Sequence, residues 1–297
     1  MSVNYSFKNS LRNHFKIRAG SYKLELGSKT SIMAILNMTP DSFSHDGLLK
    51  SNIKLTKALN IAQQFVDEGA DIIDVGGEST RPGSKPITIK EEIKRVIPVI
   101  AKLTKKIKIP ISVDTYKTDV AKGALDAGAM IVNTIKGINP DNNLLRMVKN
   151  YNAAIVLMHM KGTPETMQKN IHYKSLIKDI IDSLRKSVEN CLEIGIKSDR
   201  IIIDPGIGFG KTLEQNLEII HRLKEFRVLN KPILIGTSRK SFIGKILNND
   251  VNERLYGTIA TATASILNGA HILRVHDVKA LKEASIVTDA ILTVSKK

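Results

Sequence analysis

The residues best suited to chemistry follow short apolar runs rich in Ile and Val. They are acids, amides, histidines and one arginine: Asn37, Asp74, Asp114, Asn133, His159, Asp204 and the run Arg274-Val275-His276. Buried carboxylates and amides can form paired hydrogen bonds with a ring edge that presents donors and acceptors. Arg274 can fork onto phosphate oxygens, and His276, next but one along the same run, points to the same side. These residue types therefore suit a polar site for a small molecule.

The elements that must position these residues alternate along the chain from Ser31 onward. Apolar runs alternate with longer segments of helical period, which is typical of repeated βα units and a parallel sheet. Eight strands are expected, at Ile32–Asn37, Ile72–Val75, Ile111–Asp114, Ile131–Thr134, Ala154–His159, Ile201–Asp204, Ile233–Gly236 and Ile272–Val275. Amphipathic helices are expected at segments such as Ile53–Glu68, Lys90–Lys106, Tyr173–Ile194 and Val278–Val294. This count favours an α/β fold, a closed (β/α)8 TIM barrel, over an open sheet.

The first thirty residues do not fit the repeating unit. Tyr22–Leu26, followed by Gly27-Ser28, is expected to form a short N-terminal hairpin arm that caps the lower end of the barrel. Residues 1–30 are therefore predicted to be this arm, and residues 31–297 a single barrel domain. A chain of 297 residues is within the size range of one α/β barrel.

In such a barrel the carboxyl ends of all strands meet on one face, where active sites are built. The polar residues at these ends could instead be only helix caps, since Asp, Asn, Ser and Thr favour those positions. Capping alone accounts poorly for an acid or amide at the end of nearly every strand. The pattern therefore predicts an active site on this face.

Composition limits the class of protein. The chain is 42% hydrophobic and 25% charged, which is ordinary for a globular protein with a sizeable core. Its apolar stretches are far shorter than the roughly 20 residues that span a bilayer, and residues 1–20 lack a secretory signal. A soluble, cytoplasmic protein without a membrane partner is expected. Cys191 has no partner and is expected to be structural.

The formal net charge of +16 could indicate nucleic-acid binding. The lysines, however, are scattered among acids, as in residues 90–95, and do not form a basic tract. A lysine-rich solvated surface is the favoured interpretation, and no nucleic-acid partner is expected.

Six motifs occur in order at the strand ends. They are residues Asn37–Ser44, Gly76–Ser84, Ser112–Thr115, Asp204–Lys211, Ser238–Ser241 and Arg274–Asp277. With these motifs the sequence resembles the dihydropteroate synthase family from about Ile32 to the C-terminus. The resemblance implies a transferase of folate biosynthesis that condenses 6-hydroxymethyl-7,8-dihydropterin diphosphate with p-aminobenzoate, releasing 7,8-dihydropteroate and diphosphate.

The resemblance also implies roles for individual residues. The residues implied for the pterin diphosphate are Thr80, Asp114, Asn133, Asp204, Lys240, Arg274 and His276, with Met158 and Phe209 on the ring faces. Those implied for p-aminobenzoate are Phe43, Arg81, Pro82, Phe209 and Ser241. Asn37 would coordinate a magnesium ion, Mg2+, that bridges the diphosphate. Asp114, Asp204 and Lys240 are the expected catalytic residues, with the two acids stabilising positive charge as diphosphate leaves.

The sequence departs from the family pattern twice. Thr134 follows Asn133 where the family usually has an acid, and His45-Asp46-Gly47 replaces a more usual Asp-Gly-Gly pattern. The first change puts a neighbouring hydrogen bond in doubt, and the second affects the first loop. His159 is interpreted as a supporting or core histidine.

Two other functions are compatible with parts of the sequence. A pterin-binding methyltransferase domain shares the barrel but should lack the two long loops and the Ser-Arg-Lys-Ser helix start. A non-catalytic pterin-binding or nucleic-acid-binding protein is suggested only by the basic charge. The resemblance also implies a homodimer packed through C-terminal helices, and the small residues of Thr258–Ala264 suit either such an interface or packing on the barrel.

Overall fold

The computed structural model describes residues 12–39, 51–80 and 83–294, with the side chains of 51–54 excepted. Parallel strands form the centre of the molecule: β3 (Ser31–Asn37), β4 (Ile72–Gly76), β5 (Ile111–Asp114), β6 (Ile131–Thr134), β7 (Ala154–Met158), β8 (Ile201–Asp204), β9 (Leu234–Ile235) and β10 (Ile272–Val275). Their order is β8-β7-β6-β5-β4-β3-β10-β9. The two remaining edges meet at a bridge between Ile203 and Ile233, and the Ile203 N–H donates to the Pro232 carbonyl at 3.0 Å. The predicted (β/α)8 barrel is confirmed.

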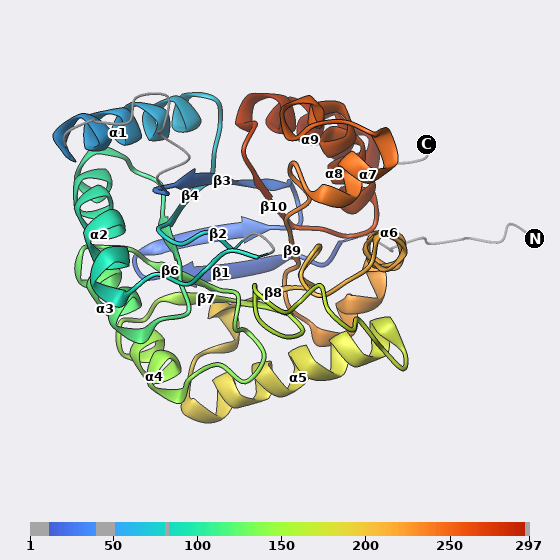
Figure 1. Cartoon of the computed structure of the whole chain (residues 1–297), viewed down its shortest axis with the longest axis horizontal. Coiled ribbons are helices and arrows are strands. Elements are labelled where there is room, and N and C mark those ends of the chain that lie inside the picture. Colours follow the sequence, from blue (N-terminus) through green and yellow to red (C-terminus); the bar gives the residue numbers. More distant parts are fainter. Residues whose placement is uncertain (1–11, 40–50, 81–82, 295–297) are drawn as a thin grey trace, which may run out of the picture.

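Helices surround these strands as a ring (Figure 1). They are α1 (Ser51–Asp67), α2 (Ile89–Lys106), α3 (Thr118–Asp126), α4 (Asn142–Asn150), α5 (Leu176–Ile194), α6 (Leu213–His221), α7 (Ser241–Leu247), α8 (Leu255–Leu267) and α9 (Val278–Thr293). Helix α5 begins later than the expected Tyr173, and the Asp179 carboxylate of its first turns accepts the N–H groups of Lys174 and Ser175, which precede the helix. The expected seventh strand is shortened to Leu234–Ile235.

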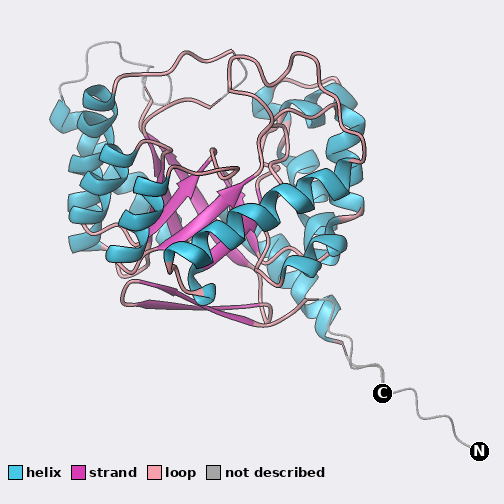
Figure 2. Cartoon of the chain, turned by 90° about the horizontal axis from the view of Figure 1, so that it is seen from below, coloured by secondary structure: helices cyan, strands magenta, loops and turns pink. Residues whose placement is uncertain are grey.

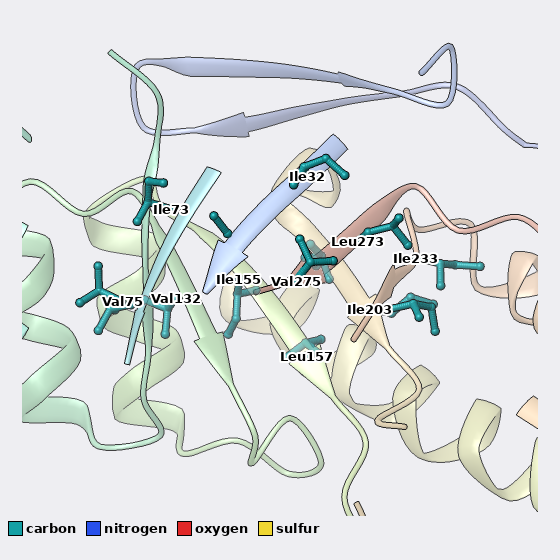
Figure 3. Close-up of a cluster of buried hydrophobic side chains, with 14 of the residues drawn as sticks. Ile32, Ile73, Val75, Val132, Ile155, Leu157, Ile203, Ile233, Leu273 and Val275 are labelled. Carbon is teal, nitrogen blue, oxygen red and sulfur yellow. The ribbon is translucent and has the colours of Figure 1, made fainter. Parts of the chain in front are cut away.

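Alternation along the strands divides the apolar side chains into two layers, because successive residues point to opposite faces of a sheet. One cluster faces the helices, and Figure 3 shows part of it, with Val75, Val132 and Ile155 labelled on three of the strands. The other fills the lower barrel interior and includes Met33 and Ile72. Strands buried on both faces explain why these segments read as nearly continuous Ile and Val runs.

A hairpin closes the lower end of the barrel. Its antiparallel strands, β1 (Phe15–Ala19) and β2 (Tyr22–Leu26), lie beneath the barrel strands in Figure 2. Ile17, Ala19 and Leu26 are buried in the same cluster as the lower interior. The predicted hairpin arm is therefore confirmed, with β1 as the partner strand of Tyr22–Leu26 and the turn between Ala19 and Tyr22.

The position of the turn has a steric reason. Gly20 has φ +57°, a conformation that favours glycine, and a Cβ there would lie 2.0 Å from Met130 Sδ. The Gly20 N–H donates to the Asn152 carbonyl at 3.0 Å, which fixes the hairpin to the barrel. The division of the chain into an arm and one barrel domain stays a prediction.

Two further features concern the expected class of protein. Within the described ranges, no helix has the length and apolar character needed to cross a membrane. Cys191 is buried in α5, and burial raises the pKa of its thiol to about 12. It is therefore an unreactive core side chain at neutral pH.

We expect Ile17→Ala to lower the free energy of unfolding by about 2–4 kcal/mol, because it removes a fully buried side chain from the lower interior and leaves a cavity. Urea denaturation followed by circular dichroism measures the change. Lys23→Ala, an exposed substitution in the same hairpin, is the matched control. Equal stability of the two variants would mean that the hairpin does not contribute to the core.

Candidate active site

The inner face of the barrel changes from apolar to polar along each strand. Ile72, Ile131, Ile202 and Ile272 belong to the lower interior cluster. Two residues further along the same strands are Asp74, Asn133, Asp204 and Arg274. Since residues two apart in a strand share a face, these polar side chains point into the barrel above the apolar layer. The register places Asp114 beside both Gly76 and Asn133, so Asp114 joins the same layer.

Arg274 forms the centre of this polar layer. Its Nε lies 2.7 Å from Asp74 Oδ2, and its Nη2 lies 2.7 Å from Asp114 Oδ2. Burial alone would lower the pKa of Arg274, but the charges of Asp74 and Asp114 raise it above its ordinary value. Asn133 Nδ2 also donates to Asp74 Oδ2, at 3.0 Å. Asp74 therefore orients both the arginine and the amide from below.

Asp114 and Asp204 are acids with unusual ionisation. Burial raises the pKa of Asp114 to about 7, although the charge of Arg274 opposes that shift. Burial also raises the pKa of Asp204 to about 6, and a hydrogen bond from the Gly206 N–H to Asp204 Oδ1, at 2.7 Å, opposes it. Both carboxyl groups can thus gain or lose a proton near neutral pH, which is typical of active sites.

Lys240 and Phe209 form a cation–π pair on the β8 and β9 side of the face. The Lys240 Nζ lies 4.1 Å from the centre of the Phe209 ring. Burial lowers the pKa of Lys240 to about 8, and Arg274 adds to that effect. Gly208 lies beside the lysine stem, where a Cβ would be in ordinary van der Waals contact with Lys240 Cδ at 3.4 Å, and its φ of +82° favours glycine. Ser241, the first residue of α7, is exposed beside this pair.

His276 is fixed by Ser238, which lies in the loop that follows the neighbouring strand β9. Ser238 Oγ lies 3.0 Å from His276 Nδ1, and the His276 N–H donates to the same oxygen at 3.2 Å. Burial lowers the pKa of His276 to about 3, so the ring is neutral at pH 7. Arg239, at φ +56°, pairs with Asp277 and holds the connection between β9 and α7 in place.

Asn37 is the expected magnesium ligand. A Cβ at Gly76 would lie 3.6 Å from both Asn37 Oδ1 and Asp114 Cβ, so the amide oxygen and the acid are neighbours across this glycine. Among the described residues, no three His, Cys, Asp or Glu side chains gather as a metal site. Asn37 is partly exposed, and its amide oxygen would suit a Mg²⁺ ion whose other ligands come from phosphate and water.

Some of the remaining predicted residues lie at this face, and others lie outside the described part of the chain. Thr80 lies in the β4–α2 loop, and Met158 packs with Phe209 in a small buried cluster. Phe43, Arg81, Pro82 and the His45 departure lie outside the described residues. Thr134 is fully buried, and its hydroxyl accepts the Lys136 N–H at 3.3 Å. Thr134, which stands where the family usually has an acid, therefore stabilises the turn that follows it.

Two residues of this face have contacts that the sequence does not indicate. Asp74, in the sequence an acid at a strand end, holds both Arg274 and Asn133. The available signal was that Asp74 and Arg274 both point into the barrel. Lys211 is buried, and its Nζ lies 3.0 Å from both His159 Nδ1 and the Phe209 carbonyl. Burial lowers the pKa of Lys211 to about 7. His159 is buried beside it, as expected for a supporting histidine.

Known proteins share both the sequence and the fold. Residues 33–276 match the family described as pterin binding enzyme. The dihydropteroate synthase of Clostridium beijerinckii is 43% identical over 277 residues, which cover 93% of this chain and 99% of that protein.

Two solved structures resemble this one closely. The first is dihydropteroate synthase of Yersinia pestis in complex with a sulfonamide drug, with a TM-score of 0.88, 38% identity, and coverage of 94% of this chain and 100% of that one. The second is the Xanthomonas albilineans enzyme with 4-aminobenzoic acid, with a TM-score of 0.87, 33% identity, and coverage of 95% and 100%. The resemblance expected from the six motifs is thus confirmed, and the chain belongs to the dihydropteroate synthase family of pterin-binding enzymes.

Proposed function

We propose that this enzyme condenses 6-hydroxymethyl-7,8-dihydropterin diphosphate with p-aminobenzoate to give 7,8-dihydropteroate and diphosphate. The observation that supports this most directly is the polar layer inside the barrel, where Arg274 lies between two carboxylates and beside an amide. Such a layer offers acceptors and donors to a heterocyclic ring and positive charge to a phosphate group. Family membership and the fold support the same reaction.

The pterin ring is assigned to Asp114, Asn133, Asp204 and Lys240. Carboxylates accept hydrogen bonds from the amino and ring N–H groups, and an amide both donates and accepts. The Lys240 ammonium reaches the remaining polar atoms from the opposite side of the layer. Met158 and Phe209 supply apolar contacts for the ring faces.

The diphosphate is assigned to Arg274, His276 and Thr80. Arg274 carries a permanent charge and more donors than its two acid partners use. The neutral His276 ring has an N–H to donate. Asn37 would hold Mg²⁺ at the same mouth, and a bound ion would offset the negative charge of the leaving diphosphate.

The p-aminobenzoate pocket is assigned to residues around the cation–π pair. Phe209 and the stem of Lys240 would form one wall, and Ser241 with the first N–H groups of α7 would receive the carboxylate. Phe43, Arg81 and Pro82, from the first two loops, are proposed to complete the pocket. These loops would also exclude water, which would otherwise compete with the arylamine.

The chemistry requires no nucleophile from the protein. The bond between the exocyclic methylene carbon and the diphosphate oxygen breaks, and its electron pair leaves with the diphosphate. The ionised Asp114 and Asp204 stabilise the positive charge that develops on the pterin, which is the kind of effect that contributes most in many enzymes. The arylamine nitrogen then attacks the methylene carbon and loses a proton.

We also propose that the enzyme is a cytoplasmic homodimer. Helices α8 and α9 contact each other, and both carry exposed apolar side chains. Tyr256 is 82% exposed on α8, and Ile286, Val287 and Ile291 are 58%, 61% and 63% exposed on α9. Thr258 and Ala262 of α8 are buried within the chain, so only the outer side of this helix pair is available to a second copy.

An assay with both substrates and Mg²⁺, scoring dihydropteroate and diphosphate, tests the function. We expect turnover by the wild type and a loss of at least about tenfold in kcat/KM for Lys240→Ala, because a charged hydrogen bond to the ring is removed. Lys245→Ala, which changes an exposed lysine on helix α7 just after Lys240, is the control. A folded wild type that binds pterin but forms no product would be a binding protein and not a synthase.

The pH dependence of kcat/KM for dihydropterin diphosphate tests the two acids. Each acid must be ionised to act, so kcat/KM should rise with pH through values of about 6 and about 7. It should fall again at higher pH as Lys240, whose pKa is about 8, loses the proton that makes it a charged donor. Asp114→Asn should lower the maximum about 10- to 100-fold and leave a single rise near pH 6 on the acid side. The exposed Asp119→Asn should keep the wild-type profile. A flat wild-type profile across this range would contradict the assignment.

Sedimentation velocity tests the dimer. Val287→Lys introduces a charge on the exposed side of α9 and should convert the dimer to a monomer, since an unpaired buried charge is costly. Val228→Lys changes a valine of similar exposure, 63%, on another segment and should leave the mass unchanged. A monomeric wild type, or a dimer that survives Val287→Lys, would argue against this interface.

A further inference from the structure

A buried ionic cluster lies at the base of the β4–α2 loop. The Lys117 Nζ lies 2.6 Å from Glu78 Oε2 and 2.6 Å from Glu92 Oε2, and it donates to the Ile87 carbonyl at 2.7 Å. The three ionic side chains are 11%, 7% and 1% exposed, respectively. These residues come from three segments: the β4–α2 loop, helix α2, and the connection from β5 to α3.

The cluster holds together the two ends of the β4–α2 loop, at Glu78 and Ile87, which form the neck of the loop. Glu78 Oε2 also accepts the Ile87 N–H at 2.8 Å, so the residues on either side of segment 79–86 are joined directly and again through Lys117. Gly77, just before the neck, packs against α2, because a Cβ there would lie 2.8 Å from Val96 Cγ1. Arg95 Nη1 donates to the Gly77 carbonyl at 3.0 Å. The start of the loop is therefore fixed on two sides.

Burying three charged side chains contributes little net stability to a fold. Removing an ammonium and two carboxylates from water costs several kcal/mol per ion, which their attraction often only balances. An apolar cluster of similar volume would hold α2 against the barrel as well. Unlike apolar contacts, the charge-assisted hydrogen bonds of this cluster are directional, so they fix the backbone of Ile87 and the side chain of Glu78 in one geometry.

The neck connects two parts of the active site. Lys117 follows Asp114 by three residues, and Thr80 follows Glu78 by two. The pair between Lys117 and Glu78 thus joins the strand end assigned to the pterin ring with the loop assigned to the diphosphate. Displacements of about 1 Å at such positions can cost on the order of a hundredfold in rate.

We propose that Glu78 and Lys117 are positioning residues, which set where the β4–α2 loop leaves the barrel and so bring Thr80 to the diphosphate end of the substrate. The inference rests on the proposed function, because it assumes that this loop meets the diphosphate. Neither residue is assigned a contact with substrate. Their effect should appear only when the substrate carries its diphosphate.

Glu78→Ala is the informative variant, because Lys117 keeps its partner Glu92 and the core keeps a balanced ion pair. We expect kcat/KM for dihydropterin diphosphate to fall at least about tenfold. The dissociation constant of 6-hydroxymethylpterin, which has the ring without the diphosphate, should stay within about twofold of wild type by calorimetry. Glu78→Gln, whose amide oxygen can still accept from Lys117 and Ile87, should recover most of the activity.

Asp126→Ala removes an exposed acid paired with Lys122 on α3 and is the control for loss of an ion pair. If Glu78→Ala does not fold, Glu78→Asp, which keeps the charge on a shorter side chain, should show the same split between turnover and ring binding. Wild-type kcat/KM in Glu78→Ala, or a parallel loss of ring binding in either variant, would overturn the proposal. A wild type that forms no dihydropteroate would instead refute the proposed function.

Discussion

The active site depends on one arginine held between two carboxylates inside a barrel. Arg274 supplies the positive charge that makes burial of Asp74 and Asp114 tolerable, and the two acids supply the negative charge that does the same for Arg274. Removing Arg274 would leave two carboxylates without their counter-charge in a region where water is scarce, which costs more than the pairs contribute. Asn133 completes the arrangement by donating to Asp74. Arg274 with Asp74 and Asp114 forms an ionic fork, and the proposed geometry of ring and phosphate recognition follows from it.

The fork can exist only because the barrel interior changes character along its axis. The lower half is filled by Ile and Met side chains and closed by the hairpin, so it excludes water from beneath the charges. The upper half, reached two residues later on each strand, carries the polar groups. This low-dielectric floor raises the pKa values of Asp114 and Asp204 into the neutral range. The apolar packing at the base of the barrel thus influences the ionisation of the acids at its mouth.

Most strands and the polar residues at their ends could be predicted from the sequence, because hydrophobic periodicity and polarity are local signals. The runs at Ile111–Asp114, Ile131–Thr134 and Ile201–Asp204 matched the strands residue for residue. The hairpin arm at Tyr22–Leu26 was predicted, but its partner strand was not, because Phe15–Ala19 is a short segment of mixed polarity. The inward position of Asp74 could be predicted, but its pairing with Arg274 could not, because the two residues lie on strands far apart in the sequence. The contact of Lys211 with His159 could not be predicted either, because it depends on how the loops after β7 and β8 fold. Family resemblance, and not spacing, supplied the substrates.

The pairing of the first barrel strand with the last has a consequence for synthesis on the ribosome. Strand β3 forms one ladder with β4 soon after both emerge, but its other edge pairs with β10, which is made near the end of the chain. Until then β3, with its Ile, Met and Leu side chains, presents an open edge of unpaired N–H and carbonyl groups to other nascent chains. Non-local pairings of this kind also slow folding. Truncated chains that stop before Ile272 would therefore remain substrates for chaperones, and the newly made protein is safe from aggregation only when its circle of strands is complete.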